Sequence, residues 1–240
     1  RTGFKVEDAD GNVYRYSHFG ADTNRGVLVA QDVSESSCGD SDNIIVASAS
    51  CTDTNDGKAG SYYMEITAGE PATAITADQF AGGKFITSDD AGEGYTYDIV
   101  GNTGNAVNAA TFRLQLAQPL QVAVTTATDF IIVGNKYANL EIATNGTDAI
   151  LAGVTCATMD VSAKAWGWVQ TKGFVGILCA GTDVIGEKIA LSLVTSGAVV
   201  CTSYPGSAGN EQSQSLDQVL GSCVIPGDAT GHGVYYINLD

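Results

Sequence analysis

Apolar and polar residues alternate in many short segments, and this pattern constrains the fold more than any other feature of the sequence. In residues 95–99 the apolar positions are Tyr95, Tyr97 and Ile99, and residues 111–116 repeat the pattern. A period of two is typical of a half-buried strand, and no helical period persists beyond about three turns. Twenty-nine glycines supply residues suited to tight turns. We therefore expect an all-β protein of antiparallel β-sandwich or β-barrel modules with little helix.

The length of 240 residues suits either one large all-β domain or two smaller ones. The hydrophobic fraction of 44% is sufficient for a core. A weak shift in composition near Asn145 favours an N-terminal β module over residues 1–145 and a C-terminal β module over residues 146–240. A single domain is the alternative.

Both tryptophans, Trp166 and Trp168, lie two positions apart, so in a strand they share one face. Residues 171–173 then predict a short turn, which makes residues 165–180 a hairpin. Two indole rings bury much area in a core, but they are also favoured at binding hot spots. The small opposite face, which includes Gly167, suits close packing. We therefore place five aromatic residues in the core: Trp166, Trp168, Phe174, Tyr95 and Tyr97.

The formal net charge of −16 narrows the range of partners. An acidic surface repels the backbone of nucleic acids and anionic membrane surfaces. The sequence has no run of about 18 apolar residues, which a spanning helix requires. It also shows no signal peptide, and its start at Arg1 suggests that upstream residues were removed or not included. We expect neither a nucleic-acid nor a membrane partner.

Six cysteines stand at positions 38, 51, 156, 179, 201 and 223. None forms a C-x-x-C pair and no histidine lies at ligand spacing, so we expect no metal site and no cofactor. Cys38 and Cys51 flank one strand-like segment, and a local disulfide between them is one option. The four later cysteines favour buried thiols on successive strands, because free cysteine behaves as a small hydrophobe.

The sequence contains no motif that indicates catalysis. Its two histidines, His18 and His232, each lie next to a turn, and neither has an obvious acidic or nucleophilic partner in the sequence. A Ser-His-Asp site assembled from distant residues stays open, but there is no G-x-S-x-G segment or other nucleophile motif. We expect the protein not to be an enzyme.

Several segments together resemble the virion structural proteins of tailed bacteriophages, of the head decoration (capsid cement) type. The most specific are GEGYTY at residues 92–97 and the W-x-W-x-Q-T-x-G pattern at residues 166–173. The resemblance covers most of the chain, through residues 14–31, 76–87, 91–103, 112–124 and 165–178. It implies a non-enzymatic protein on the outer surface of the capsid head. Such a protein binds the major capsid protein, stabilises the virion and associates with itself, most often as a homotrimer.

The N-terminal segment is our choice for the capsid contact, because it is dense in aromatic residues around a polar turn. Strand addition by an exposed edge or arm is one mode of attachment. The residues expected to touch the capsid are Phe4, Val6, Tyr14, Tyr16, His18 and Phe19. A competing interpretation is a phage fibre, spike or adhesin module that binds a host receptor or glycan. A third, a secreted β-sandwich hydrolase, predicts a cleft with clustered carboxylates.

Overall fold

A computed structural model describes residues 1–32, 37–40, 55–67, 75–104, 111–125, 127–144, 149–181, 183–202, 219–228 and 231–240. Over these ranges the chain is all-β and its paired strands are antiparallel, which confirms the expected fold class. None of the described residues forms a helix with the length and apolar character needed to cross a membrane. The strands are β1 (Lys5–Glu7), β2 (Val13–His18), β3 (Leu28–Asp32), β4 (Ser37–Asp40), β5 (Tyr63–Thr67), β6 (Lys84–Asp89), β7 (Thr96–Asn102), β8 (Thr111–Leu116), β9 (Asp129–Val133), β10 (Leu140–Ile142), β11 (Ala149–Thr155), β12 (Trp166–Leu178), β13 (Lys188–Leu191), β14 (Val199–Cys201), β15 (Gly221–Ile225) and β16 (His232–Asn238).

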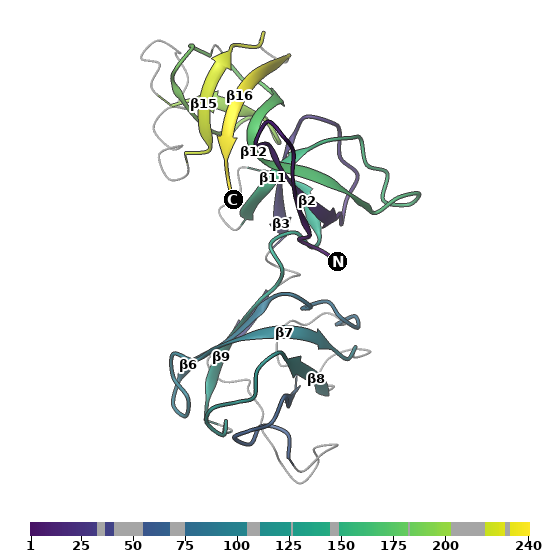
Figure 1. The fold of residues 1–240 in the computed structure, drawn as a ribbon, viewed down its shortest axis with the longest axis vertical. Helices are drawn as coiled ribbons and strands as arrows, with labels where there is room; N and C mark the ends of the chain where they lie inside the picture. Colours follow the sequence, from purple (N-terminus) through teal and green to yellow (C-terminus); the bar gives the residue numbers. More distant parts are fainter. Residues whose placement is uncertain are drawn as a thin grey trace. The chain divides into compact units, whose positions relative to one another are not determined.

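The chain folds into two compact units, and the division differs from the one expected near residue 145 (Figure 1). Unit 1 combines Arg1–Asp32 with Lys136–Asp240, and unit 2 is Val33–Asn135. Unit 2 is therefore an insertion between β3 and β10, which pair with each other. The N-terminal strands β2 and β3 pair with β12 and β11, so they need partners from beyond residue 145.

Unit 1 is organised around the 13-residue strand β12. Its N-terminal half pairs with β2 and β11, and its C-terminal half pairs with β16. The sheet runs in the order β10-β3-β11-β12-β16-β15-β13-β14, and β2 pairs with both β12 and β1. This one strand thus joins the N-terminal strands to the C-terminal ones.

The hairpin expected at residues 165–180 is wrong, because β12 is continuous through the predicted turn. The pairing with β2 shifts register between Gln170 and Lys172, and Gly173 has a φ of +101°. A Cβ at Gly173 would lie 2.0 Å from the Oδ1 atom of Asn12, which accepts a hydrogen bond from the Phe174 N–H. Glycine inside a strand can mark a bulge and a close approach rather than a turn.

The inward face of β12 has no room for indole rings, so these rings lie on the outward face. A Cβ at Gly167 would lie 2.7 Å from the Sδ atom of Met159, and Val169 is fully buried. The space under this face is already filled, so only small side chains fit there. Unit 1 has two clusters of buried residues, Phe19, Val27, Val29, Tyr137, Leu140, Ala152, Met159 and Val169 in one, and Leu28, Ala30, Ala143, Leu151, Val154, Ile177, Ile189, Val199, Cys201, Leu220, Cys223, Tyr235 and Ile237 in the other.

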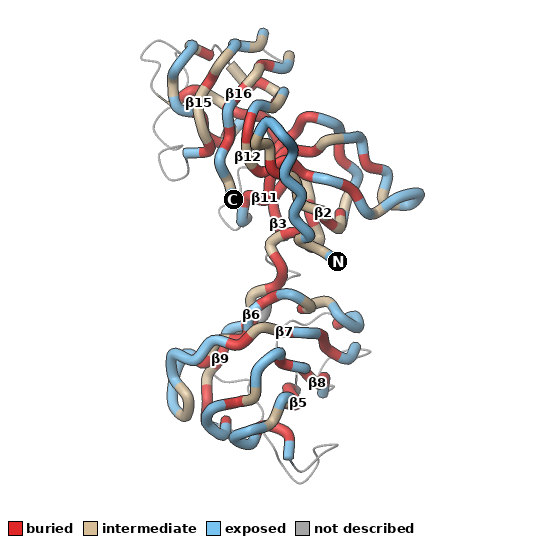
Figure 2. The backbone as a smooth tube through the Cα atoms, viewed as in Figure 1, coloured by how far each residue is buried: buried red, intermediate tan, exposed pale blue. Residues whose placement is uncertain are grey.

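Unit 2 is a six-stranded sheet in the order β4-β9-β6-β7-β8-β5. Along β8 and all but the last residue of β7, buried positions alternate with exposed or half-buried ones (Figure 2). Tyr97 is buried as expected, and its hydroxyl accepts a hydrogen bond from the Gln121 N–H at 3.0 Å. Tyr95 is exposed, so its placement in the core is wrong. It lies before β7, directly after Gly94 with a φ of +81°, and the strand does not fix its direction.

Candidate functional site

Five aromatic side chains of unit 1 gather on the outward face of β1, β2 and β12. Cross-strand pairing sets Trp166 opposite His18 and Trp168 opposite Tyr16. Because directly opposed residues point to the same side of a sheet, these four rings share one face. Phe4, next to β1, joins them through a contact with Trp168. We call Phe4, Tyr16, His18, Trp166 and Trp168 the aromatic face.

Each ring of the aromatic face contacts at least one other ring of the face. Tyr16 stacks on Trp166 with centroids 5.6 Å apart and meets Trp168 edge-on at 5.2 Å. His18 meets Trp166 edge-on at 4.8 Å, and Phe4 meets Trp168 at 6.3 Å. Aromatic pairs in these geometries stabilise one another by about 0.5–1.5 kcal/mol. The face is thus a preorganised surface.

The core assignment of the tryptophan segment is wrong. Trp166 and Trp168 are 40% and 36% exposed, and Phe174 is 60% exposed. Among the described aromatic residues, Phe174 contacts one ring, that of the exposed Tyr236, with centroids 5.3 Å apart. All three side chains project from the side of β12 opposite its filled inner face.

The expected contact residues divide into two groups. Phe4 and Val6 are exposed, and Tyr14, Tyr16 and His18 are half-buried, so all five are accessible at the surface. Phe19 is only 1% exposed and packs in the core beside Val27 and Met159. Its expected contact with a capsid is therefore wrong, because it points to the inner side of the strand end.

Strand β1 adds an open backbone edge beside the aromatic face. Among the described strands it pairs with β2 alone, and its three residues are exposed. The Tyr16 N–H donates to the Phe4 carbonyl, and the Asp8 N–H donates to the Asn12 carbonyl. Since inward and outward amides alternate in an antiparallel pair, the amide of Glu7 points away from β2. An incoming strand can bond there.

The opposite side of β1 and β2 is held by Asp240. Its Oδ1 accepts hydrogen bonds from Arg15 Nε at 2.9 Å and Nη2 at 2.7 Å, and its Oδ2 lies 3.3 Å from Lys5 Nζ. Burial opposes ionisation of Asp240, but the hydrogen bonds from Arg15 and Lys5 outweigh it and lower the pKa of its carboxyl group. This ion cluster fixes the backbone that carries the aromatic face.

The aromatic face carries no carboxylate, although the chain as a whole is strongly acidic. Its only titratable group that ionises near neutral pH is His18, and burial lowers the pKa of that imidazole. The face is therefore uncharged at neutral pH.

A groove of about 610 Å³ lies next to the aromatic face. Phe174 and Gln170 of β12 line it together with Tyr14, Arg25 and His232. The described residues of its lining include no carboxylate, so they do not supply the acid pair on which glycoside hydrolysis depends. The sequence predicted that His18 and His232 lie next to turns, but it gave no sign that His232 lines this groove.

The cysteines of the C-terminal half are free thiols, as expected. Cys179, Cys201 and Cys223 are buried, and Cys156 is half-buried in the wall of the groove. The sequence did not predict that the three buried thiols gather around Asp183. The expected disulfide of Cys38 falls outside the described residues, because Cys51 and the side chain of Cys38 are not described.

Comparison with known proteins gave no match to a family model, a curated protein or a solved structure.

Proposed function

We propose that the protein is a non-enzymatic head decoration protein of a tailed bacteriophage. It docks on the outer surface of the major capsid shell through the aromatic face and the open edge of β1, and it stabilises the virion. The observation that carries the proposal is the aromatic face itself, in which two exposed indole rings lie beside an edge of β1 that no described strand pairs with.

The composition of the face suits a protein partner. Tryptophan and tyrosine are enriched among the residues that dominate interface energies, and such residues cluster at the centre of a contact. An edge strand supplies backbone hydrogen bonds to an added strand, while neighbouring side-chain contacts supply specificity. Both elements lie within one small region of unit 1.

The charge of the chain agrees with a position on the outside of a head. An acidic exterior repels DNA and keeps like particles apart in solution. Repetition of one modest contact over a lattice raises the overall strength of attachment. A homotrimer would multiply this effect, and sedimentation of the purified protein tests that part of the proposal.

The experiment that tests the proposal is co-sedimentation with heads of the cognate phage that lack the protein. The variant is Trp166→Ala with Trp168→Ala. The matched control is Ile185→Ala with Val194→Ala, which truncates two apolar side chains of the same unit that are each 68% exposed. The two tryptophans are expected to contribute at least about 2 kcal/mol to the binding free energy. Their loss therefore lowers the affinity by about 30-fold or more.

The control should bind like the unchanged chain. Equal binding of the aromatic variant would overturn docking through this face. In a density map of the intact particle, copies spread over the head are expected, and copies confined to the tail or vertices would exclude a decoration role.

The groove favours a second candidate function, a fibre or adhesin module that binds a host glycan. Phe174 offers an apolar ring, and Arg25, Gln170 and His232 offer polar groups around it. Pockets that fix small ligands combine these two kinds of side chain. Phe174→Ala should abolish glycan binding and leave head binding intact if the groove has a separate role.

A further inference from the structure

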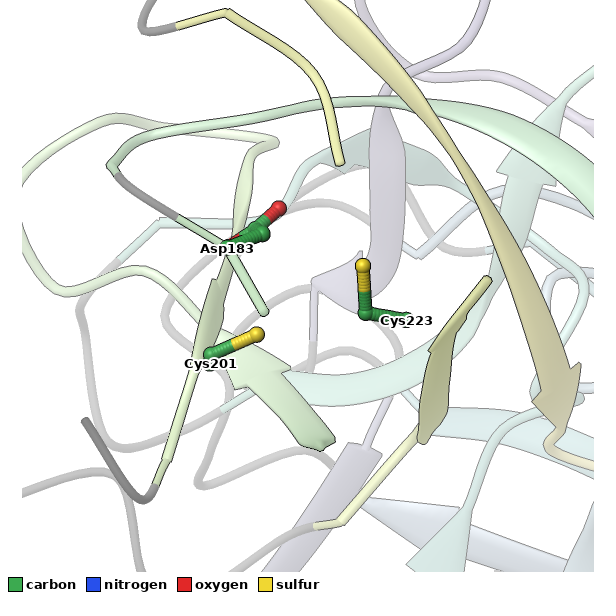
Figure 3. A group of neighbouring side chains, drawn as sticks. All are labelled: Asp183, Cys201 and Cys223. Carbon is green, nitrogen blue, oxygen red and sulfur yellow. The ribbon is translucent and has the colours of Figure 1, made fainter. Parts of the chain in front are cut away.

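Three potential metal ligands from separate segments converge in the interior of unit 1 (Figure 3). Asp183 precedes β13, Cys201 ends β14, and Cys223 lies on β15. All three residues are buried, and their ligand atoms all lie within 4.8 Å of one another. The cluster shares no residue with the aromatic face and has no part in the proposed docking.

The carboxylate of Asp183 is only partly satisfied. Its Oδ2 accepts hydrogen bonds from the Tyr235 hydroxyl and from the Cys179 thiol, the latter at 3.1 Å. Its Oδ1 has no hydrogen-bond partner among the described residues, and the residue is only 5% exposed, so water cannot readily replace that partner. No salt bridge among the described residues involves Asp183. A buried carboxylate oxygen left unpaired is costly, and a bound cation removes that cost.

A second carboxylate oxygen nearby is also without a partner. Glu187 lies opposite Cys223, whose N–H donates to the Glu187 carbonyl at 2.8 Å. The Oε2 atom of Glu187 is buried and makes no hydrogen bond with any described residue. Two such oxygens beside three thiols indicate that a positive charge belongs in this region.

A disulfide between Cys201 and Cys223 does not explain the cluster. β14 and β15 pair with opposite edges of β13, so they are separated by two strand spacings. That separation is about 9–10 Å in a flat sheet, whereas a disulfide requires Cα atoms within about 7 Å. Sulfur atoms that bind one metal ion lie about 3.8 Å apart, because each Zn–S bond is about 2.3 Å long.

We propose that Asp183, Cys201 and Cys223 bind one Zn²⁺ ion. As each sulfur–zinc bond forms, the thiol releases its proton to solvent. Thiolates select a soft or borderline ion over Mg²⁺ or Ca²⁺. All three ligand residues are buried. The ion ties the segment before β13 to β14 and β15.

Titration with Co²⁺ tests the site directly, because this ion replaces Zn²⁺ and is visible. The reduced full-length chain, freed of metal by a chelator, should bind one Co²⁺ per chain. Thiolate-to-cobalt charge-transfer bands and intense visible bands of a tetrahedral complex should appear, and equimolar Zn²⁺ should remove them. Absence of these bands in the folded chain would overturn the proposal.

Variants assign the ligands. Cys223→Ser and Asp183→Asn should each lower Co²⁺ affinity by at least about tenfold. Cys156→Ala is the matched control, since this thiol lies in the groove wall, and it should leave the spectrum unchanged. Circular dichroism establishes that each variant is folded before titration.

A further variant tests whether the two N-terminal cysteines, Cys38 and Cys51, bind the metal ion. A chain with Cys38→Ser and Cys51→Ser should keep full binding and the same spectrum. If the bands disappear in that chain but persist in the folded Cys223→Ser chain, the metal binds elsewhere and the proposal is wrong. Zn²⁺ should raise the melting temperature of the unchanged chain and not that of Cys223→Ser.

Discussion

Trp168 lies directly opposite Tyr16 across β12 and β2, with ring centroids 5.2 Å apart and planes inclined by 61°. The indole is 36% exposed, so it contributes both to the packing of the aromatic face and to the surface that a partner meets. This one pair links the strand that organises unit 1 to the N-terminal strands.

Substitution of Trp168 by alanine should affect binding more than folding. Full burial of a tryptophan would make the loss of unfolding free energy about 3–5 kcal/mol, and partial exposure lowers that expectation to about 1–2 kcal/mol. Urea unfolding measures the stability change, and co-sedimentation with heads measures binding. A loss above about 4 kcal/mol would show that the indole supports the core.

Gly173→Ala should destabilise unit 1 by about 2–3 kcal/mol. Its φ of +101° is unfavourable for alanine, and the new Cβ would displace Asn12 from the Phe174 N–H. Gly176→Ala is the control on the same strand, because the nearest atom to its Cβ is 3.9 Å away. Equal melting temperatures for the two variants would contradict this account of the β12 bulge.

Asp240→Asn should make the free energy of unfolding depend less on pH in the acidic range. Because the folded-state pKa of Asp240 lies below its unfolded value near 3.9, its contribution is full above that pH and is lost as pH falls through the folded pKa. At pH 7 the variant should lose about 1–2 kcal/mol. Urea unfolding between pH 3 and pH 7 measures both effects, with the exposed Asp228→Asn as control.

Glu7→Pro should weaken attachment without unfolding the protein. The Glu7 amide points away from β2, so proline removes only a donor that an added strand would use. Head affinity should fall about tenfold or more, since one backbone hydrogen bond and the fit of the strand are lost. Glu7→Ala keeps the amide and should bind normally. Equal affinity of the two variants would argue against strand addition at β1.

Period-two alternation predicted the strands of unit 2 well. Ile99 on β7 and Phe112, Leu114 and Leu116 on β8 are all buried, as the pattern requires. The same rule failed to orient β12, because alternation separates two faces without stating which one is solvated. The decisive contacts, such as that between Gly167 and Met159, come from distant parts of the chain.

Long-range assembly explains what else the sequence could not predict. Unit 2 interrupts unit 1, so a boundary drawn from local composition misses the pairing of β3 with β10 and β11. Asp183, Cys201 and Cys223 come together only through the order of β13, β14 and β15. The recurrence of cysteines at nearly even intervals was the one sequence signal that pointed to successive strands.

Both tryptophans of the chain lie on the aromatic face, so their accessibility reports on the central claim most directly. We would label the protein with 5-hydroxytryptophan, excite this label without exciting capsid tryptophans, and measure acrylamide quenching before and after attachment to heads. Docking through the aromatic face predicts a several-fold fall in quenching and a blue shift of emission. Unchanged quenching in protein that is fully bound to heads would contradict it.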